Sequence, residues 1–166
     1  MGPGGAARLA SRLAVASGAV RLHPLLVHFP IGLIVTAAVI DIVALGTDPR
    51  STLRRAATGL YLAGAATLVA AYFTGRSDAA LVRIPGPAHA IVDEHWTWAL
   101  RTTVYLGVFS AGRLLLELSG RLTGRGRWLP VVAAGLAGVL LLFQTAERGG
   151  RLVYEYGVGV AAPRTR

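Results

Sequence analysis

Hydrophobic residues occur along this chain in four long blocks, separated by polar and arginine-rich stretches. The blocks cover residues 25–46, 56–75, 96–118 and 128–146, and each is close to the roughly 20 residues that a helix needs to cross a bilayer. The hydrocarbon interior offers no hydrogen-bond partner to a free backbone amide or carbonyl, so each block is expected to be helical. The pattern predicts an all-α fold, namely an integral membrane four-helix bundle over residues 23–148 with a C-terminal interfacial tail.

The chain outside the blocks forms two terminal segments. Residues 1–22 are expected to be an N-terminal arm, partly disordered or lying in the membrane interface, because their apolar core is too short and broken for a cleaved signal peptide. Residues 149–166 are expected to be a C-terminal tail that begins where Gly149 and Gly150 end the fourth helix. Its amphipathic, strand-prone stretch GGRLVYEYGVGV predicts either a lid that folds back or an interfacial exit with tyrosine anchors.

Composition and charge favour a membrane protein over a nucleic-acid-binding one. The chain is 54% hydrophobic with a mean hydropathy of +0.56, whereas soluble domains are about 45–50% apolar. The net charge is +9, and all 17 basic residues are arginine. These arginines flank the apolar blocks instead of forming one stripe, so the lipid bilayer is the expected partner and nucleic acid is not. The absence of cysteine excludes disulfides and iron–sulfur ligation by the chain.

All four histidines fall beside the starts of the first and third blocks. His23 and His28 open the first, and His89 and His95 precede the third. Alternating topology brings these two helix ends to the same side of the membrane. Because Met1 is the only methionine and cysteine is absent, the histidines are the main candidates for ligating a haem iron or another metal.

The four histidines differ in their expected surroundings. His28 lies about one turn inside its block, where an ionisable group needs a partner or a cavity. Pro30 removes a helical hydrogen bond and is expected to open room beside it. His23 is expected to be interfacial and solvated. His89 and His95 are six residues apart, about 240° around a helix, so one of the two is expected to be structural.

Other polar residues inside the blocks suggest partners. Arg101 is expected either to meet an anion or to extend to the interface. Arg113 and Glu117 have the i,i+4 spacing of a helical ion pair, and Asp41 is expected to pair with an arginine of the short loops. Small residues at four-residue spacing predict close helix packing. They are Gly59, Ala63, Thr67, Gly107, Ala111, Ala134 and Gly138.

The opening motif HPLLVHFPIGL and the closing motif GGRLVYEYGVGV, taken together, resemble a bacterial membrane-protein family catalogued as domain of unknown function 2231. The resemblance covers about residues 22–160 and implies four transmembrane helices. Members of that family occur beside or fused to cytochrome c or Rieske-type domains, which implies a role in membrane electron transfer. The matching residues are His23, Pro24, His28, Phe29, Pro30, Asp41, Gly75, Asp78, Gly149, Gly150, Leu152, Val153, Tyr154 and Gly157, with either His89 or His95 as a later histidine.

The histidines and the resemblance predict a b-type haem-binding or quinone-linked electron-transfer subunit with its site at one membrane face. The expected iron ligands are His28 and either His89 or His95, since four-helix bundles hold cofactors between facing helices. Three arginines are expected to neutralise haem propionates. The candidate cofactor residues are therefore His28, His89, His95, His23, Arg101, Arg76 and Arg151.

The alternative is a non-redox membrane subunit, in which the histidines bind a divalent metal or serve only packing and assembly. Asp78, Asp93 and Glu94 would then assist the histidines, although the spacing matches no standard metal motif. No nucleophile–base set or phosphate loop is present, so an electron-transfer or accessory subunit is expected more than a stand-alone enzyme. Expected partners are a redox protein or a larger respiratory-type complex, a quinone, and further copies of the chain.

Arginine density predicts the orientation of the chain in a bacterial inner membrane. The short loops concentrate arginines near the ends of the blocks, which favours their location in the cytoplasm. The histidine face and both termini would then be extracytoplasmic. The short-loop arginines are Arg50, Arg54, Arg55, Arg121, Arg125 and Arg127.

Overall fold

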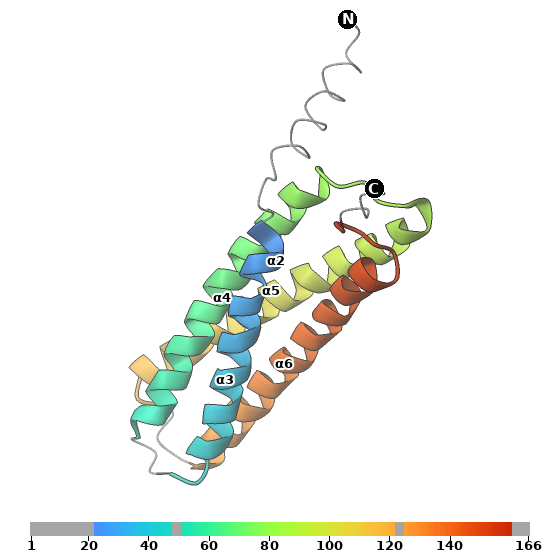
Figure 1. Ribbon diagram of the computed structural model, residues 1–166. Coiled ribbons are helices and arrows are strands. Elements are labelled where there is room, and N and C mark those ends of the chain that lie inside the picture. The colour runs from blue at the N-terminus through green and yellow to red at the C-terminus, as the bar shows by residue number, and fades with distance from the viewer. Residues whose placement is uncertain (1–21, 48–50, 122–124, 161–166) are drawn as a thin grey trace, which may run out of the picture.

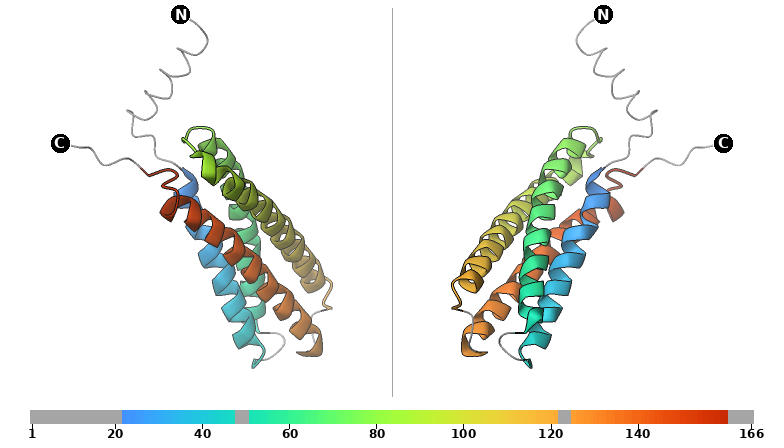
Figure 2. Two further views of the ribbon diagram at one scale, coloured as in Figure 1. Left: turned by 90° about the vertical axis from the view of Figure 1, so that its right-hand side faces the viewer. Right: turned by 90° about the vertical axis from the view of Figure 1, so that its left-hand side faces the viewer.

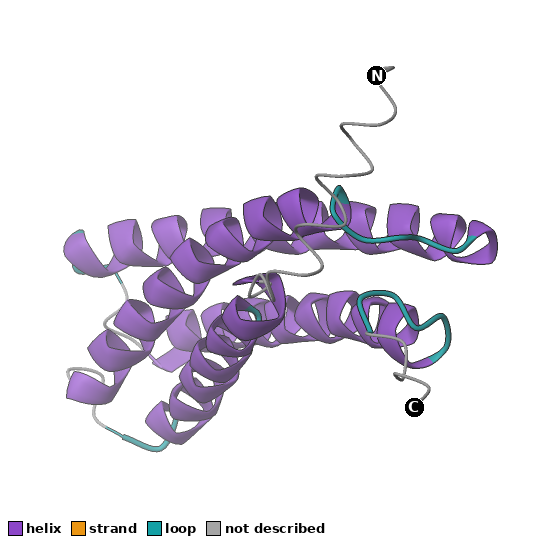
Figure 3. Cartoon of the chain, turned by 45° about the horizontal axis from the view of Figure 1, so that its top comes forward, coloured by secondary structure: helices purple, strands orange, loops and turns teal. Residues whose placement is uncertain are grey.

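The computed structural model describes residues 22–47, 51–121 and 125–160, and all regular structure in this part of the chain is helical. Figure 1 shows the helices packed lengthwise in one bundle, and Figure 3 shows helices, turns and loops but no strand in the described part of the chain. The fold class predicted from the apolar blocks is confirmed, whereas the predicted N-terminal arm lies outside the described residues up to position 21. The elements are α2 (Leu22–Leu26), α3 (His28–Ala44), α4 (Thr52–Ala79), the 3-10 turn η1 (Gly86–Ala88), α5 (His89–Leu118) and α6 (Arg125–Tyr154).

The first long helix is interrupted at Val27, between α2 and α3. Pro30 lacks the N–H that would bond the carbonyl four residues earlier, so the proline explains the break. The backbone of Val27 still donates to His23 O at 3.0 Å, which keeps the two pieces nearly in line. Pro30 was expected to open room beside His28. The break at Val27 lies directly before His28, whose side chain is exposed, while Pro30 is buried.

Three helical segments of the described chain are long and apolar enough to cross a membrane, namely Leu22–Ala44, Thr52–Ala79 and Gly126–Tyr154. The third predicted block lies in α5, which has 30 residues but carries Arg101, Arg113 and Glu117. α5 packs beside both α4 and α6, as the two side views in Figure 2 show. A fourth span in α5 stays a prediction, and its position between two spanning candidates supports it.

The outer and inner faces of the bundle suit a lipid surrounding. Large apolar side chains face outward, for example Val108 at 69% and Leu140 at 67% exposure. The centre is filled by aliphatic and aromatic side chains in close contact, and in lipid such van der Waals packing stabilises the bundle. The central cluster consists of Ile34, Ala37, Ala38, Tyr61, Leu68, Leu106 and Leu142.

Most of the glycines at close helix contacts are not the ones that the sequence predicted. A methyl group added at Gly64 would lie 2.6 Å from Ile34 Cγ1, and one at Gly138 would lie 2.5 Å from Leu106 Cδ2. The prediction for Gly138 is thus confirmed. The stripes that begin at Gly59 and Gly107 lie on open faces, because a methyl group at either glycine would meet nothing within 4 Å.

The ion pair predicted between Arg113 and Glu117 does not form, and each of these two residues pairs with a residue of another helix instead. Arg113 bonds the carboxylate of Asp41 on α3 instead of Glu117 on its own helix. Glu117 lies 3.4 Å from the exposed Arg55 of α4. The prediction of an Arg113–Glu117 pair is therefore wrong. Asp41 pairs with Arg113 of α5, and Arg54, one of the short-loop arginines, also acts electrostatically on its carboxylate, so the expected short-loop partner is borne out in part. Tertiary packing turns Arg113 inward, where a charge is stable only beside an opposite charge.

Candidate functional site

One end of the bundle contains a cavity of about 370 Å³. Its walls come from α2, the C-terminal turns of α4, the first turns of α5 and the end of α6. In Figure 1, α2 and α4 diverge at this end from α5 and α6. The cavity lies within the roughly 300–1,000 Å³ range of small-molecule and cofactor sites. Its walls include two of the four histidines, His23 and His95.

His23 is held in place by α4. Its ring Nδ1 lies 2.8 Å from the carbonyl oxygen of Ala71, and its backbone N–H donates to Asp78 Oδ2 at 3.1 Å. A carbonyl oxygen can only accept, so Nδ1 carries the proton. In the neutral tautomer with Nδ1–H, the other ring nitrogen, Nε2, carries the lone pair.

His95 is held in the same way by α6. Its Nδ1 lies 3.1 Å from the carbonyl oxygen of Thr145. The Thr145 hydroxyl group in turn lies 2.8 Å from that of Thr102 and donates to Leu141 O at 3.0 Å, which anchors this part of α6 to α5. His95 therefore also keeps its Nε2 lone pair available, since Nδ1 must be the donor.

Two glycines make room for the two imidazole rings. A methyl group at Gly75 would lie 2.9 Å from His23 Cε1, and one at Gly149 would lie 3.2 Å from His95 Cε1. Each histidine therefore packs against the bare backbone of the helix that accepts its Nδ1 hydrogen bond. The two halves of the site, α2 with α4 and α5 with α6, therefore share the same arrangement of histidine, carbonyl and glycine.

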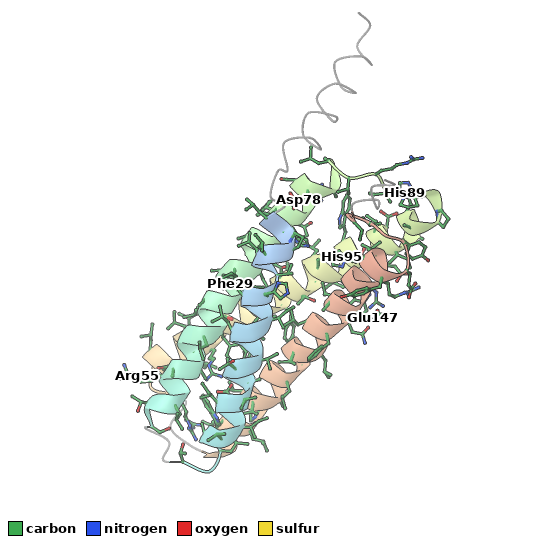
Figure 4. The ribbon with its side chains drawn as sticks, in the orientation of Figure 1. Phe29, Arg55, Asp78, His89, His95 and Glu147 are labelled. Carbon is green, nitrogen blue, oxygen red and sulfur yellow. The ribbon has the colours of Figure 1, made fainter. Side chains whose placement is uncertain are left out.

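The two rings lie close together in an edge-on arrangement. Their centroids are 6.5 Å apart, and the ring planes are inclined at 81°. His23 and His95 come from positions 72 residues apart in the sequence, since 95 minus 23 is 72. Topology alone predicted that these helix ends share a side of the bundle, and this prediction is confirmed for the pair; Figure 4 labels His95 at this end, below His89 and Asp78.

The other two histidines do not line the cavity. His28 is exposed on α3, and His89 is exposed at the first position of α5 (Figure 4 labels it beside the loop). The structure therefore does not bring together His28 and His95, or His28 and His89. It brings together His95 and His23, the histidine that was expected to be solvated. The anchors of this pair are backbone carbonyls of Ala71 and Thr145, which no side-chain pattern reveals.

Of the three candidate arginines, Arg76 alone is among the cavity residues. Its guanidinium lies 5.1 Å from the ring centroid of Trp96, another cavity residue. Arg151 lies 3.1 Å from Glu155 and is engaged in an ion pair at the surface. Arg101 is exposed and contacts the ring of Trp98 at 5.7 Å.

The residues after α6 cover the outer side of the cavity. α6 continues to Tyr154, so the expectation that Gly149 and Gly150 end it is wrong, and both lie inside the helix. The chain reverses at Gly157, whose φ is +62°, and Val158 N donates back to Leu152 O at 2.8 Å. This turn lines the cavity with apolar groups. They pack with a small cluster made of Ala88, Ile91, Val92, Leu152, Ile84, Trp96, Tyr156 and Val158.

The arrangement offers two nitrogen ligands and few carboxylates. Asp78 is engaged by the His23 backbone, while Asp93 and Glu94 are exposed on α5. Within residues 22–47, 51–121 and 125–160, no three His, Cys, Asp or Glu side chains are grouped as a metal ion would require. A ligand of this site would bind two imidazoles and an otherwise mostly apolar wall.

The helices, the apolar outer surface and the buried charges define a multi-pass helical membrane protein. A family model described as "Predicted membrane protein (DUF2231)" matches residues 19–162, and the chain belongs to this family. Neither the curated proteins nor the solved structures contain a match to the chain.

Proposed function

We propose that this membrane protein is an electron-transfer subunit that binds a b-type haem, and that His23 and His95 would hold its iron. The observation that carries the proposal is the ring pair itself, whose centroids are 6.5 Å apart. Two imidazoles bound to opposite sides of one metal ion at about 2 Å each bring their ring centroids to about 6 Å. His23 and His95 therefore have the separation of a pair that shares one iron.

The hydrogen bonds of both rings support the same interpretation. A histidine that ligates a metal usually donates its other ring N–H to a carbonyl or carboxylate, which fixes the tautomer and orients the ring. His23 does so to Ala71 O, and His95 does so to Thr145 O.

The walls of the cavity suit the remainder of a haem. Trp96, Val92 and Leu152 supply apolar contacts for the macrocycle, and Arg76 is the cation available to a propionate. Gly75 and Gly149 let the rings lie against the helices, where they are held without strain. The turn at Gly157 and Val158 would exclude water. Haem bound through two imidazoles supplies one-electron transfer with no open iron position, so this chemistry is electron carriage more than oxygen binding.

The test is the absorbance spectrum of the full chain purified in detergent, with and without added haem, recorded oxidised and dithionite-reduced. We expect a Soret band and a sharp reduced α-band, and their loss in His23→Gln and in His95→Gln. His28→Gln and His89→Gln are matched controls, since both side chains are exposed, and should keep the wild-type spectrum. A wild-type protein without a haem spectrum after supplementation would overturn the proposal.

The same experiment distinguishes haem from two other possible ligands of the cavity, a quinone and a divalent metal. A quinone would give no Soret band, and the free Nε2 atoms of His23 and His95 would accept hydrogen bonds from the quinol form. A divalent metal would appear in elemental analysis at about one ion per chain without a visible spectrum, and the two histidines would need ligands from outside the described residues. We also propose that the histidine end is extracytoplasmic, where a redox partner would dock.

A further inference from the structure

A shallow groove runs along the outer seam between α5 and α6, away from the histidine cavity. It consists of two adjoining hollows of about 690 and 670 Å³ that share Val108 and Phe109. On α5 the groove extends from Leu100 to Leu116, about 24 Å at the helical rise per residue. That length exceeds one leaflet of a bilayer whose hydrocarbon core is about 30 Å thick.

Most of the groove wall is apolar, and the end of the groove near the short loops, its mouth, is charged. The floor is formed by side chains such as Val104, Phe109 and Val131. At the short-loop end, Arg121 and Arg127 line the hollow, and both are exposed. The Arg127 guanidinium donates to the carbonyl oxygen of Arg121 at 3.4 Å, which keeps the two residues together.

The positive charge at this mouth has no acidic counterpart in the groove wall. Neither Asp nor Glu is among the groove-lining residues, and the nearby Glu117 lies 3.4 Å from Arg55 on α4. Arg113 also borders the hollow, but its charge is neutralised by Asp41 inside the bundle. The exposed Arg101 borders the far end of the upper hollow, and the wall between it and the mouth is apolar apart from the neutralised Arg113. The two exposed guanidiniums at the mouth complement a phosphate above an acyl chain.

Gly112 creates the space for such a chain. It lines the lower hollow, and a methyl group added there would meet nothing within 4 Å. A larger side chain at this position would therefore fill the groove without disturbing the interior of the bundle. Gly107 on the same helix also faces open space but is not among the groove residues, which makes it a matched control.

We propose that the α5–α6 groove binds one anionic phospholipid, with the phosphate at Arg121 and Arg127 and an acyl chain along Phe109 and Val108. The site is independent of the histidine cavity and of any haem. It would anchor the arginine-rich end of the bundle to the leaflet that faces that end.

The test is native mass spectrometry of the full chain in detergent, titrated with either phosphatidylglycerol or phosphatidylcholine. Two arginines near a phosphate favour the anionic lipid by about ten-fold or more, which is the preference expected for the wild type. Arg121→Gln with Arg127→Gln should abolish the preference. Gly112→Leu should weaken the binding of both lipids. Arg83→Gln and Gly107→Leu, which alter an exposed arginine and an open glycine elsewhere, should match the wild type.

Three outcomes would overturn the proposal. The first is equal binding of the two lipids by the wild type. The second is a preference that survives the double arginine substitution. The third is a dimer that Gly112→Leu dissociates, since a second copy of the chain would then fill the seam. The haem spectrum should be unchanged in every groove variant, so failure of this proposal is distinguishable from failure of the proposed function.

Discussion

Arg113 on α5 donates two hydrogen bonds to the carboxylate of Asp41 on α3, at 2.6 and 2.7 Å, and neither side chain is exposed. The same guanidinium donates to the hydroxyl group of Thr58 on α4 at 2.8 Å. One charged side chain thus joins three helices at the end of the bundle opposite the histidines. Because its charge is neutralised and its donors are used, Arg113 does not prevent α5 from crossing a membrane.

Removal of Asp41 should destabilise the bundle strongly. In Asp41→Ala the guanidinium of Arg113 stays buried without its carboxylate, and the expected loss is about 3–5 kcal/mol of unfolding free energy. Chemical unfolding in detergent, followed by tryptophan fluorescence, measures this loss. Glu117→Gln is the control, because its ion pair with the exposed Arg55 should contribute at most about 1 kcal/mol. Equal effects of the two substitutions would contradict this role of Asp41.

Simultaneous replacement of both partners separates the charge from the packing. Asp41→Leu combined with Arg113→Leu leaves no isolated charge, and apolar replacements of buried ion pairs are often neutral. The double variant should therefore be more stable than Asp41→Ala in the same unfolding experiment. A double variant as unstable as the single one would indicate that packing by Arg113, not its charge balance, stabilises this end.

Alanine substitutions at glycines should have opposite signs at two kinds of position. Gly138→Ala forces a methyl group against Leu106, and the overpacking should cost about 1–3 kcal/mol. Gly107→Ala meets open space, so the better helix propensity of alanine should stabilise by up to about 1 kcal/mol. Thermal unfolding of the two variants, compared with that of the wild type, measures the sign of each change in stability. The same sign for both would show that these helices adjust their spacing freely.

The turn after α6 should control how firmly the cavity retains its ligand. Gly157 has a φ of +62°, so Gly157→Ala places a side chain in the left-handed region at a cost of about 1–2 kcal/mol. The turn that carries Val158 over the cavity should then open more often. Haem transfer to an excess of apomyoglobin should become several-fold faster, whereas Gly86→Ala, at an open position of η1, should leave the rate unchanged. An unaltered rate in Gly157→Ala would mean that the turn does not close the site.

Orientation in the membrane is directly measurable because the chain has no cysteine. Ala90→Cys introduces a thiol at the histidine end of the bundle, and Ser119→Cys introduces one at the arginine-rich end; both positions are exposed. The positive-inside rule predicts that a membrane-impermeant maleimide labels the first variant in intact spheroplasts and the second only after lysis. Labelling in the reverse order would put the histidine cavity on the cytoplasmic side.

The apolar blocks predicted the helices well, because the hydrocarbon interior leaves a long apolar segment no alternative to helix. The ends of the helices were predicted less well. Pro30 was expected to open room beside His28, and the break lies at Val27, next to His28, but His28 is exposed and does not line the cavity. Gly149 and Gly150 resemble a helix end, yet both lie inside α6, where the backbone of Gly149 faces the ring of His95.

The sequence did not reveal which side chains of different helices contact one another. Local spacing paired Arg113 with Glu117, whereas packing turned Arg113 toward Asp41, 72 residues away. Because His28 lies deeper in its apolar block than His23, the sequence favoured His28 as the ligand. The orientation of His23 depends instead on the carbonyl of Ala71 and on the missing side chain at Gly75, both on another helix. Such contacts follow from the register between helices, which a single sequence does not specify.

The most direct measurement of the central proposal is the low-temperature electron paramagnetic resonance spectrum of the oxidised, haem-loaded protein. Two imidazole ligands make ferric haem low-spin, and the 81° between the planes of His23 and His95 should give a strongly anisotropic signal. We predict that signal in the wild type, in His28→Gln and in His89→Gln, and a high-spin signal or none in His23→Gln and His95→Gln. A low-spin signal that survives loss of His23 or His95, or that disappears with His28, would contradict the account.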